Sequence, residues 1–257
     1  MIPSLDDLRV VPLECLILHE AHDARRLAGL RERIAAEGVQ RNPVIVAPHE
    51  TNYLVLDGAH RVHAMREIGC RLILVQVVEP PLAAESWGHL IHGVEIPKLR
   101  NVDSAVVSDE AGDSPVATVQ MAGGATVYIG ARETGLGGVV RALWSMQELY
   151  SNGDSNGDVV RRVDPDGPVE IGEGEALIHY RTFTVEELVE IVRCGTVLPA
   201  GITRFRLRER VLGVRFPLEH MRDGDAEAGN KELRRFVEEQ WKQNRIRYYG
   251  EPVVLFE

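Results

Sequence analysis

The segment from Tyr53 to Gly69 reads YLVLDGAHRVHAMREIG and contains the strongest local structural signals of the chain. Its first residues alternate in hydrophobicity with a period of two, which predicts a β-strand ending at Asp57. Its second half repeats apolar residues at helical spacing, and Gly69 follows where the end of a helix favours a left-handed residue. The stretch therefore predicts a strand that turns at Asp57-Gly58 directly into a helix.

The turn itself, Gly58-Ala59-His60-Arg61, has the composition of an anion-binding site. Unpaired backbone N–H groups and the positive end of the helix dipole converge at the N-terminus of a helix. Arg61 adds a planar guanidinium suited to phosphate. Asp57 ends the strand, where a carboxylate can reach a metal ion bridging phosphates or accept a proton from a hydroxyl. The alternative is an ordinary strand-turn-helix with a solvent-facing arginine.

The composition is that of a globular protein without a large basic face. The chain has 257 residues, of which 44% are hydrophobic and 26% charged, and a formal net charge of −10. This charge argues against sequence-independent binding to nucleic acid. No apolar run approaches the roughly 20 residues of a membrane span and no signal-peptide core is present, so we expect a cytoplasmic protein.

The numbers and positions of the cysteines and lysines limit which kinds of disulfide, metal and phosphate site the chain can form. The three cysteines are widely spaced and predict neither a disulfide framework nor a zinc ribbon. The few lysines, Lys98, Lys231 and Lys242, lie outside any GxxxxGK[ST] motif. Nucleotide phosphates would therefore have to be held by backbone N–H groups, arginines and a metal ion.

The first part of the chain, residues 1–80, reads as a β-α-β-β-α-β unit. Strand and helix patterns surround the opening stretch in the order Leu8 to Leu18 (strand, around Pro12), Ala24 to Glu37 (helix, capped by Asp23), Val44 to Ala47 (strand) and Leu72 to Val78 (strand). Pro80-Pro81 is the expected boundary. The predicted fold class is α/β (α+β), with this domain followed by a mixed α+β domain over residues 81–257.

The second domain is expected to contain hairpins and helices. Val116 to Ala131 alternates about a Gly-Gly turn, which predicts a hairpin, and Thr184 with Glu187 forms a capping box for a helix to Cys194. The remaining expectations are a helix over Ala84 to His92, a loop over Ser104 to Ser114, a helix over Leu136 to Tyr150, a strand over Ala176 to Tyr180, a hairpin of Ile202 to Leu207 with Val211 to Phe216, a helix over Lys231 to Arg247 with Trp241 inward, and a strand over Pro252 to Phe256.

Two polar clusters outside the turn are candidates for chemistry. His19 and His22 flank Glu20, but their spacing is not that of the HExxH zinc motif. Glu20 is instead a candidate catalytic carboxylate at a strand end, with a surface carboxylate as the alternative. Thr203 and Arg204 offer a hydroxyl, a backbone N–H and a guanidinium, which suit a small carboxylate ligand. The alternative there is an exposed hairpin edge.

Several motifs resemble the ParB/sulfiredoxin superfamily, namely LHE at Leu18 to Glu20, NPVIV at Asn42 to Val46 and DGAHR at Asp57 to Arg61. ESWGH around Trp87 and LPAGITRF at Leu198 to Phe205 narrow the likeness to the free L-serine kinases, including those associated with siderophore biosynthesis.

Other branches of the superfamily fit less well. Sulfiredoxins use a cysteine where this chain has Ala59, so sulfinic-acid reduction lacks its thiol. ParB proteins share a GxxRxxA pattern, met here by Gly58, Arg61 and Ala64, and bind nucleotide there. They also carry a helical DNA-binding domain, whereas here the following region reads as hairpins.

The resemblance implies transfer of a phosphoryl group from ATP or ADP to free L-serine, with Mg2+ between the phosphates. The product, O-phospho-L-serine, would supply a siderophore building block such as 2,3-diaminopropionate. Glu20 would activate the serine hydroxyl, and Asp57 would act as a second catalytic carboxylate or as a magnesium ligand. The remaining implied residues are Gly58, Ala59, His60 and Arg61 for the nucleotide and Trp87, Thr203, Arg204 and Phe205 for serine.

The implied partners are L-serine and an adenine nucleotide, without membrane or DNA, and a homodimer is compatible with the sequence. Two alternatives remain open at this point. One is a ParB-like nucleotide-dependent DNA-binding regulator without kinase activity, and the other is a binding module that has lost catalysis.

Overall fold

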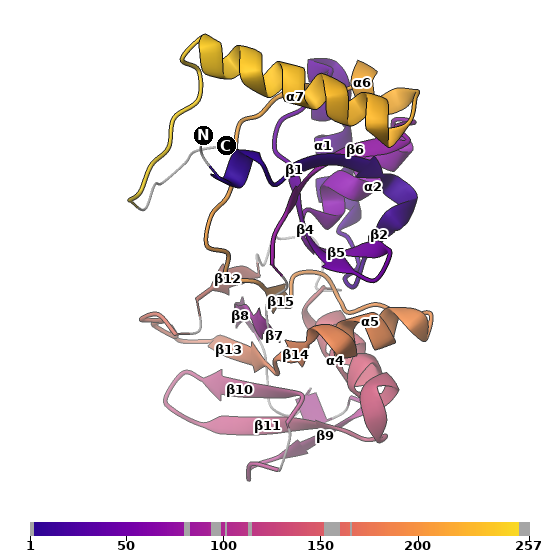
Figure 1. The fold of residues 1–257 in the computed structure, drawn as a ribbon. Helices are drawn as coiled ribbons and strands as arrows, with labels where there is room; N and C mark the ends of the chain where they lie inside the picture. Colours follow the sequence, from indigo (N-terminus) through magenta and orange to yellow (C-terminus); the bar gives the residue numbers. More distant parts are fainter. Residues whose placement is uncertain are drawn as a thin grey trace. The chain divides into compact units, whose positions relative to one another are not determined.

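A computed structural model describes residues 3–79, 83–93, 99–100, 102–112, 115–151, 160–164 and 166–251 (Figure 1). The chain forms two compact units. The first combines Met1–Leu16, Asp23–Glu79 and Leu207–Glu257, and the second combines Ile17–His22 and Pro80–Arg206. The expected boundary at Pro80-Pro81 lies outside the described residues, and the division into domains 1–80 and 81–257 stays a prediction. The mixed α/β fold predicted from the sequence is confirmed.

The first unit is built on a five-stranded sheet in the order β1-β6-β4-β5-β2. Strand β4 pairs antiparallel with β5 and parallel with β6, and β6 pairs antiparallel with β1. The central strands β4 and β6 contain continuous apolar runs, because the first four residues of β4 and the first five of β6 are buried, as is usual for a sheet covered on both faces. The strands are β1 (Leu8–Pro12), β2 (Leu16–Ile17), β4 (Val44–His49), β5 (Asn52–Asp57) and β6 (Leu72–Val77).

Two helices complete the predicted β-α-β-β-α-β order, which is confirmed. Helix α1 (Ala24–Glu37) begins at Asp23, whose side chain accepts a hydrogen bond from the first turn. Helix α2 (Ala59–Glu67) begins at Gly58 and is followed by Gly69, both with positive φ angles of 108° and 80°. The two helices pack against each other. The caps read from the sequence therefore define where both helices begin and end.

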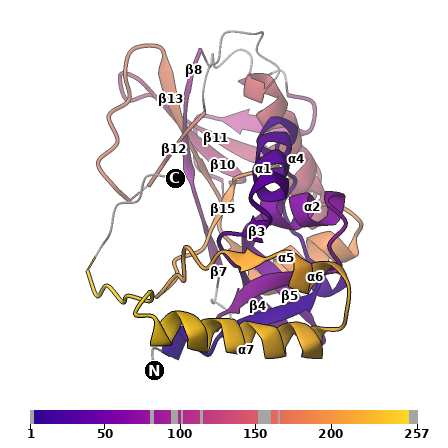
Figure 2. The same cartoon turned by 90° about the horizontal axis from the view of Figure 1, so that it is seen from above.

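The C-terminal segment also packs in the first unit, where helix α7 (Ala226–Lys242) lies beside β1 (Figure 2). The Asn230 side chain joins them by accepting from the N–H of Val10 at 2.9 Å and donating to its carbonyl at 2.7 Å. The expectation that Trp241 points inward is wrong, because its side chain is 48% exposed. Buried contacts of α7 instead involve Leu233, and the expected strand over Pro252 to Phe256 lies outside the described residues.

Shorter elements complete this unit. Strand β16 (Phe216–Pro217) pairs with β3 (Val39–Gln40), and α6 (Glu219–Arg222) follows it. The ring of Phe216 is fully buried and meets Phe236 of α7 at a centroid distance of 5.5 Å.

The second unit is built on a six-stranded sheet in the order β12-β8-β13-β10-β11-β9. The predicted hairpin is confirmed, with Ala117 opposite Ile129 and two left-handed glycines in its turn. The predicted helices α4 and α5 are also confirmed, and Thr184 and Glu187 form the expected capping box. The elements are β8 (Gly88–His92), β9 (Ala105–Ser108), β10 (Ala117–Met121), β11 (Thr126–Ala131), α4 (Gly135–Ser151), β12 (Arg161–Val163), β13 (Glu175–Tyr180) and α5 (Val185–Arg193).

Three sequence predictions for this part of the chain are wrong. The helix expected over residues 84–92 is instead β7 (Ala83–Ser86) and β8, because β8 finds partners on both sides in β12 and β13. The loop expected over residues 104–114 contains the edge strand β9. The hairpin expected from residue 202 does not form, because β15 (Thr203–Arg204) pairs with β7 and β16 pairs with β3. Each error concerns a partner distant in sequence.

Short strands complete the second unit, where β7 also pairs with β14 (Phe183–Thr184). Among the described residues, no helix has both the length and the apolar character needed to span a bilayer.

Candidate functional site

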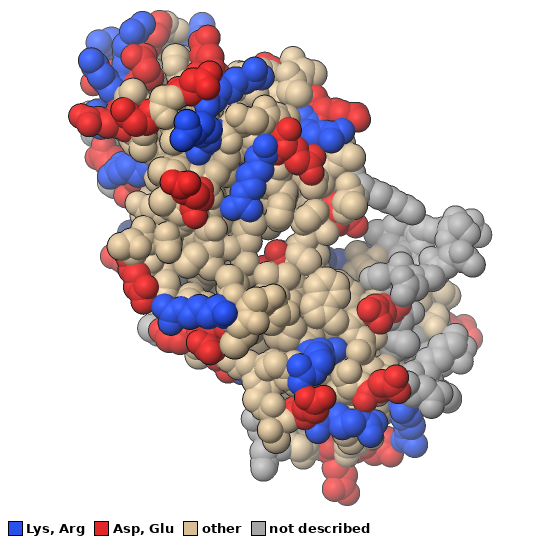
Figure 3. Space-filling view, turned by 90° about the vertical axis from the view of Figure 1, so that its right-hand side faces the viewer, with Lys and Arg blue, Asp and Glu red and all other residues tan. Residues whose placement is uncertain are grey.

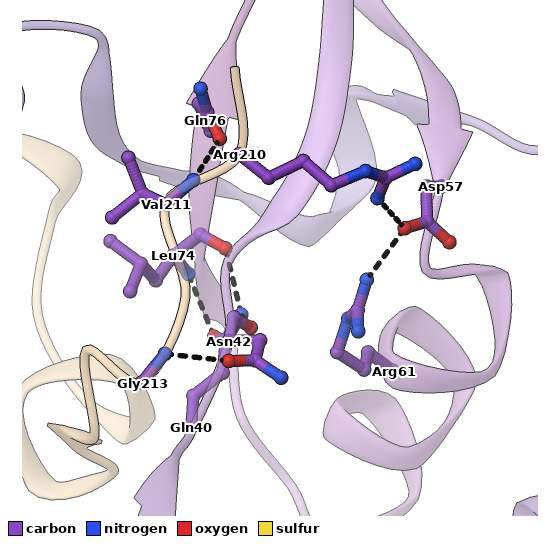
Figure 4. Close-up of polar contacts among 9 residues, drawn as sticks. All are labelled: Gln40, Asn42, Asp57, Arg61, Leu74, Gln76, Arg210, Val211 and Gly213. Atoms are coloured by element: carbon purple, nitrogen blue, oxygen red, sulfur yellow. Dashed lines mark hydrogen bonds and ion pairs between the residues drawn. The ribbon is translucent and has the colours of Figure 1, made fainter. Parts of the chain in front are cut away.

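Strand β5 delivers Asp57 to the N-terminus of α2, where two arginines meet its carboxylate (Figure 4). Oδ2 of Asp57 lies 3.5 Å from Nη2 of Arg61 and 2.5 Å from Nη1 of Arg210. A Cβ at Gly58 would lie 2.7 Å from the Arg61 guanidinium. Glycine is therefore needed at position 58 for two reasons. The backbone has a φ angle of 108°, and a side chain there would collide with the Arg61 guanidinium.

The charges at this turn favour an anion. Burial by itself raises the pKa of Asp57, but the charges of Arg61 and Arg210 outweigh that effect and lower the pKa below its ordinary value. Asp57 is therefore ionised at neutral pH, and the three side chains together carry one net positive charge. Nε of Arg61 is buried and has no hydrogen-bond partner among the described residues. A positive cluster at the N-terminus of a helix suits phosphate.

His60 and Ala59 occupy the first turn of α2. The backbone N–H of Asp23 donates to Nε2 of His60 at 3.0 Å, which ties this turn to the N-cap of α1. The Nε2 atom is thus an acceptor, and His60 holds the turn in place through it. Ala59 offers a ligand only its backbone N–H.

In the second unit, the Glu20 carboxylate is held by the segment from Gly201 to Thr203. Its Oε2 accepts from the N–H of Gly201 at 3.0 Å, and its Oε1 accepts from the N–H and the hydroxyl of Thr203, each at 2.5 Å. Main-chain hydrogen bonds of Leu198 with Ala21 and His19, each 2.8 Å long, hold the two segments side by side. Both carboxylate oxygens are therefore oriented by the fold itself.

Behind this carboxylate, the Thr203 hydroxyl also contacts a buried histidine. Nε2 of His19 lies 2.9 Å from the hydroxyl oxygen, and the imidazole is only 4% exposed. The ring of Phe205 meets this imidazole edge-on at a centroid distance of 5.7 Å and is itself buried. Phe205, predicted from the resemblance to bind serine, thus packs on the interior side of the Thr203 strand.

A second buried histidine holds Gly201. Nε2 of His89 lies 2.8 Å from the carbonyl oxygen of Gly201, and Nδ1 lies 3.2 Å from the hydroxyl of Tyr180. Because a carbonyl oxygen can only accept, Nε2 carries the proton and Nδ1 accepts from Tyr180. Burial lowers the pKa of His89 to about 4, so the ring is neutral at pH 7. The imidazole therefore acts as a fixed donor to the Gly201 carbonyl.

Gly201 is also closely packed on its α-carbon. A Cβ there would lie 1.7 Å from the Arg162 guanidinium, and the residue has a φ angle of 78°. His89 and Arg162 were not predicted from the sequence as parts of the site. His89 was expected on a helix over residues 84–92, whereas it lies on a strand. The sequence Pro199-Ala200-Gly201 could have indicated a constrained turn at Gly201.

The other predicted serine-binding residues form a stacked pair. The guanidinium carbon of Arg204 lies 4.5 Å from the centre of the Trp87 ring, and its Nη1 lies 2.7 Å from Oδ1 of Asp164. The N–H of Trp87 donates to the carbonyl of Ile202 at 2.9 Å, which joins β7 to the Thr203 strand. The second unit thus brings together Glu20, Trp87, Thr203 and Arg204.

The two sets of predicted residues belong to different units. Asp57 to Arg61, with Arg210, lie in the first unit, and Glu20, Trp87 and residues 203–205 lie in the second. In the described parts of the chain, no three His, Cys, Asp or Glu side chains are grouped to hold a metal ion. Asp57 nevertheless fits magnesium as a single ionised, 43% exposed carboxylate, because Mg2+ commonly takes one or two carboxylates and completes its shell with phosphates and water.

The geometry can be compared with known proteins. No family model matches the chain. The ATP-dependent L-serine kinase SbnI of Staphylococcus aureus is 24% identical over 255 residues, which is 98% of each chain. A structure of SbnI with a C-terminal truncation from the same organism superposes with a TM-score of 0.78, 21% identity and coverage of 94% of this chain and 100% of that one. A structure of a free serine kinase in complex with AMP has a TM-score of 0.66, 17% identity and coverage of 84% and 93%.

These similarities span nearly the whole chain. The resemblance to free L-serine kinases, expected from DGAHR, ESWGH and LPAGITRF, is confirmed, and so is the fold that it implied.

Proposed function

We propose that this protein is an ATP-dependent free L-serine kinase that transfers a phosphoryl group to the serine hydroxyl and releases O-phospho-L-serine. The observation that carries the proposal is the Glu20 carboxylate, held by Gly201 and Thr203 beside the Trp87–Arg204 pair, in a chain similar over 98% of its length to an L-serine kinase. Phosphoryl transfer depends mainly on positioning and charge neutralisation. The oriented Glu20 carboxylate and the Arg204 guanidinium support the proposal because they are groups suited to these two tasks.

The nucleotide is assigned to the first unit. The backbone of Gly58, Ala59 and His60 and the guanidinium of Arg61 would hold its phosphates at the N-terminus of α2. Asp57 is proposed to hold Mg2+, which when bound would neutralise charge on the phosphates. The ionised state of Asp57 supports this role.

Serine is assigned to the second unit. Glu20 would accept the proton from the serine hydroxyl as its oxygen bonds to phosphorus and the bond from phosphorus to the nucleotide breaks. Arg204, stacked on Trp87, offers its guanidinium to the serine carboxylate. Thr203 orients Glu20, and Phe205 would act indirectly by packing against His19.

We further propose that the enzyme is cytoplasmic and that its product feeds a siderophore precursor such as 2,3-diaminopropionate. A homodimer is compatible with this role. The competing reading is a DNA-binding regulator. On the face drawn in Figure 3, the Lys and Arg side chains of the described residues are interspersed with Asp and Glu, so this face does not offer the continuous basic surface that binds DNA.

The test is an assay for O-phospho-L-serine with purified protein, L-serine, Mg2+ and either ATP or ADP. We expect product with ATP, detected by 31P NMR, and none when serine is omitted. A protein that forms no product with either donor would disprove the kinase assignment. Salt-sensitive binding to duplex DNA in the same preparation would favour the regulator.

A further inference from the structure

Residues 207–215 cross the first unit without regular secondary structure, and side chains of that unit hold them in place (Figure 4). Gln76 of β6, which is 1% exposed, accepts from the N–H of Val211 at 2.9 Å. The side-chain oxygen of Asn42 accepts from the N–H of Gly213 at 2.8 Å. We call this segment the 207–215 strap.

Arg210 projects from the strap immediately before the first of these anchors. Its Nη1 lies 2.5 Å from Oδ2 of Asp57, although the two residues are 153 positions apart in the sequence. Gln76 and Asn42 accept hydrogen bonds from backbone N–H groups of the strap, and the Arg210 side chain takes no part in these bonds. The strap therefore positions the guanidinium of Arg210, and replacing that side chain removes none of these anchors.

The Asp57 carboxylate pairs with two arginines, although one arginine is sufficient to neutralise its charge. Either arginine alone would balance the charge of Asp57, so the presence of both Arg61 and Arg210 leaves the cluster with one net positive charge. The Arg210 side chain is 42% exposed and can reach a ligand. A surplus guanidinium beside the N-terminus of a helix is an arrangement that binds phosphate.

We propose that Arg210 is a nucleotide-binding residue whose guanidinium binds the phosphates of the donor nucleotide together with Arg61. The proposal deepens the proposed function and rests on it, because it takes the anion at this turn to be a nucleotide. When the nucleotide binds, its phosphate oxygens replace Oδ2 of Asp57 as the partner of Arg210. The C-terminal segment thereby completes a phosphate site that includes Asp57, which lies 153 positions earlier in the chain.

The test is calorimetric binding of ATP, ADP and adenosine to the full-length chain without serine. Arg210→Gln should weaken ATP and ADP binding about 10- to 100-fold, because a charge-assisted hydrogen bond is lost, and should leave adenosine binding unchanged. Arg210→Lys should recover part of the loss, since it keeps the charge but not the planar fork. The matched control is Arg208→Gln, which removes the same charge from an exposed position of the strap.

Four results would overturn the assignment to Arg210. They are unchanged ATP affinity in Arg210→Gln, an equal loss of adenosine binding, an equal effect of Arg208→Gln, and no nucleotide binding by the wild-type protein. Thermal unfolding of Arg210→Gln should match the wild type, which separates lost binding from lost folding. A wild-type protein that binds ATP through Arg210 but forms no phosphoserine would refute the kinase proposal and leave the role of Arg210 intact.

Discussion

Nε2 of His89 donates to the carbonyl oxygen of Gly201 at 2.8 Å, and the N–H of the same glycine donates to Glu20 at 3.0 Å. One peptide segment thus links a buried neutral imidazole to the proposed catalytic carboxylate. Because Tyr180 holds the other ring nitrogen, the imidazole has a defined tautomer and orientation. His89 is therefore a positioning residue for the Gly201–Thr203 segment.

The first prediction concerns pH and stability. The pKa of His89 is lowered by burial from 6.5 to about 4, so the unfolded chain takes up the proton first as the pH falls. The folded state should then lose about 2 kcal/mol from this group between pH 7 and pH 5, given 1.36 kcal/mol per unit of pKa difference. Urea unfolding of His89→Gln should show a pH dependence weaker by about that amount. Equal pH dependence in the two proteins would refute the prediction.

The second prediction concerns Glu20. Glu20→Ala should lower kcat about 10²- to 10⁴-fold, the usual contribution of a general base, while ATP affinity stays unchanged. Glu20→Gln should also be impaired, because one amide oxygen cannot accept from both Gly201 and Thr203 when the other position is an NH2 donor. Glu32→Ala, an exposed glutamate on α1, is the control. Activity that survived Glu20→Ala would remove Glu20 from the mechanism.

The third prediction distinguishes the effect of the Thr203 hydroxyl from the effect of the size and shape of the Thr203 side chain. Thr203→Val removes the hydroxyl that Glu20 and His19 share, and should cost about 1–3 kcal/mol of stability because buried polar partners lose a hydrogen bond. It should also lower kcat more than it raises KM for serine, since Glu20 loses one of its orienting donors. Thr203→Ser keeps the hydroxyl and should therefore recover most of the lost stability and most of the lost kcat. If the valine variant matched the serine variant, the hydroxyl would have no such role.

The fourth prediction concerns recognition of serine. Arg204→Gln should raise KM for serine about 10- to 100-fold through loss of a charge-assisted contact to the carboxylate, with a smaller effect on ATP binding. Arg141→Gln is the matched control, because Arg141 is 52% exposed and pairs with Glu133 at the surface, where ion pairs contribute little. Steady-state kinetics at saturating ATP measure the KM for serine of the Arg204→Gln variant and of the control variant. An unchanged KM in Arg204→Gln would assign the serine carboxylate to another group.

Local sequence patterns were sufficient to predict the turn from β5 into α2. The period-two strand, the positive-φ glycine at position 58 and the helical repeat lie next to one another in the sequence, and the structure forms them as predicted. Arg210 was missed because its role depends on the strap returning to Asp57 from 153 residues away. His89 was missed because β8 is a strand only through its pairing with β12 and β13.

Elements that depend on neighbouring residues could be predicted from the sequence, such as the capped helices α1 and α5, the Gly-Gly hairpin and the turn into α2. Periodicity, caps and left-handed glycines act over a few residues, so they can be read without knowing the rest of the fold. The groups that hold the Glu20 carboxylate are brought together by the tertiary fold and could not be predicted from local sequence. Its hydrogen bonds to Gly201 and Thr203 join residues 181 and 183 positions apart, and such pairs form only because the folded chain brings the two segments side by side.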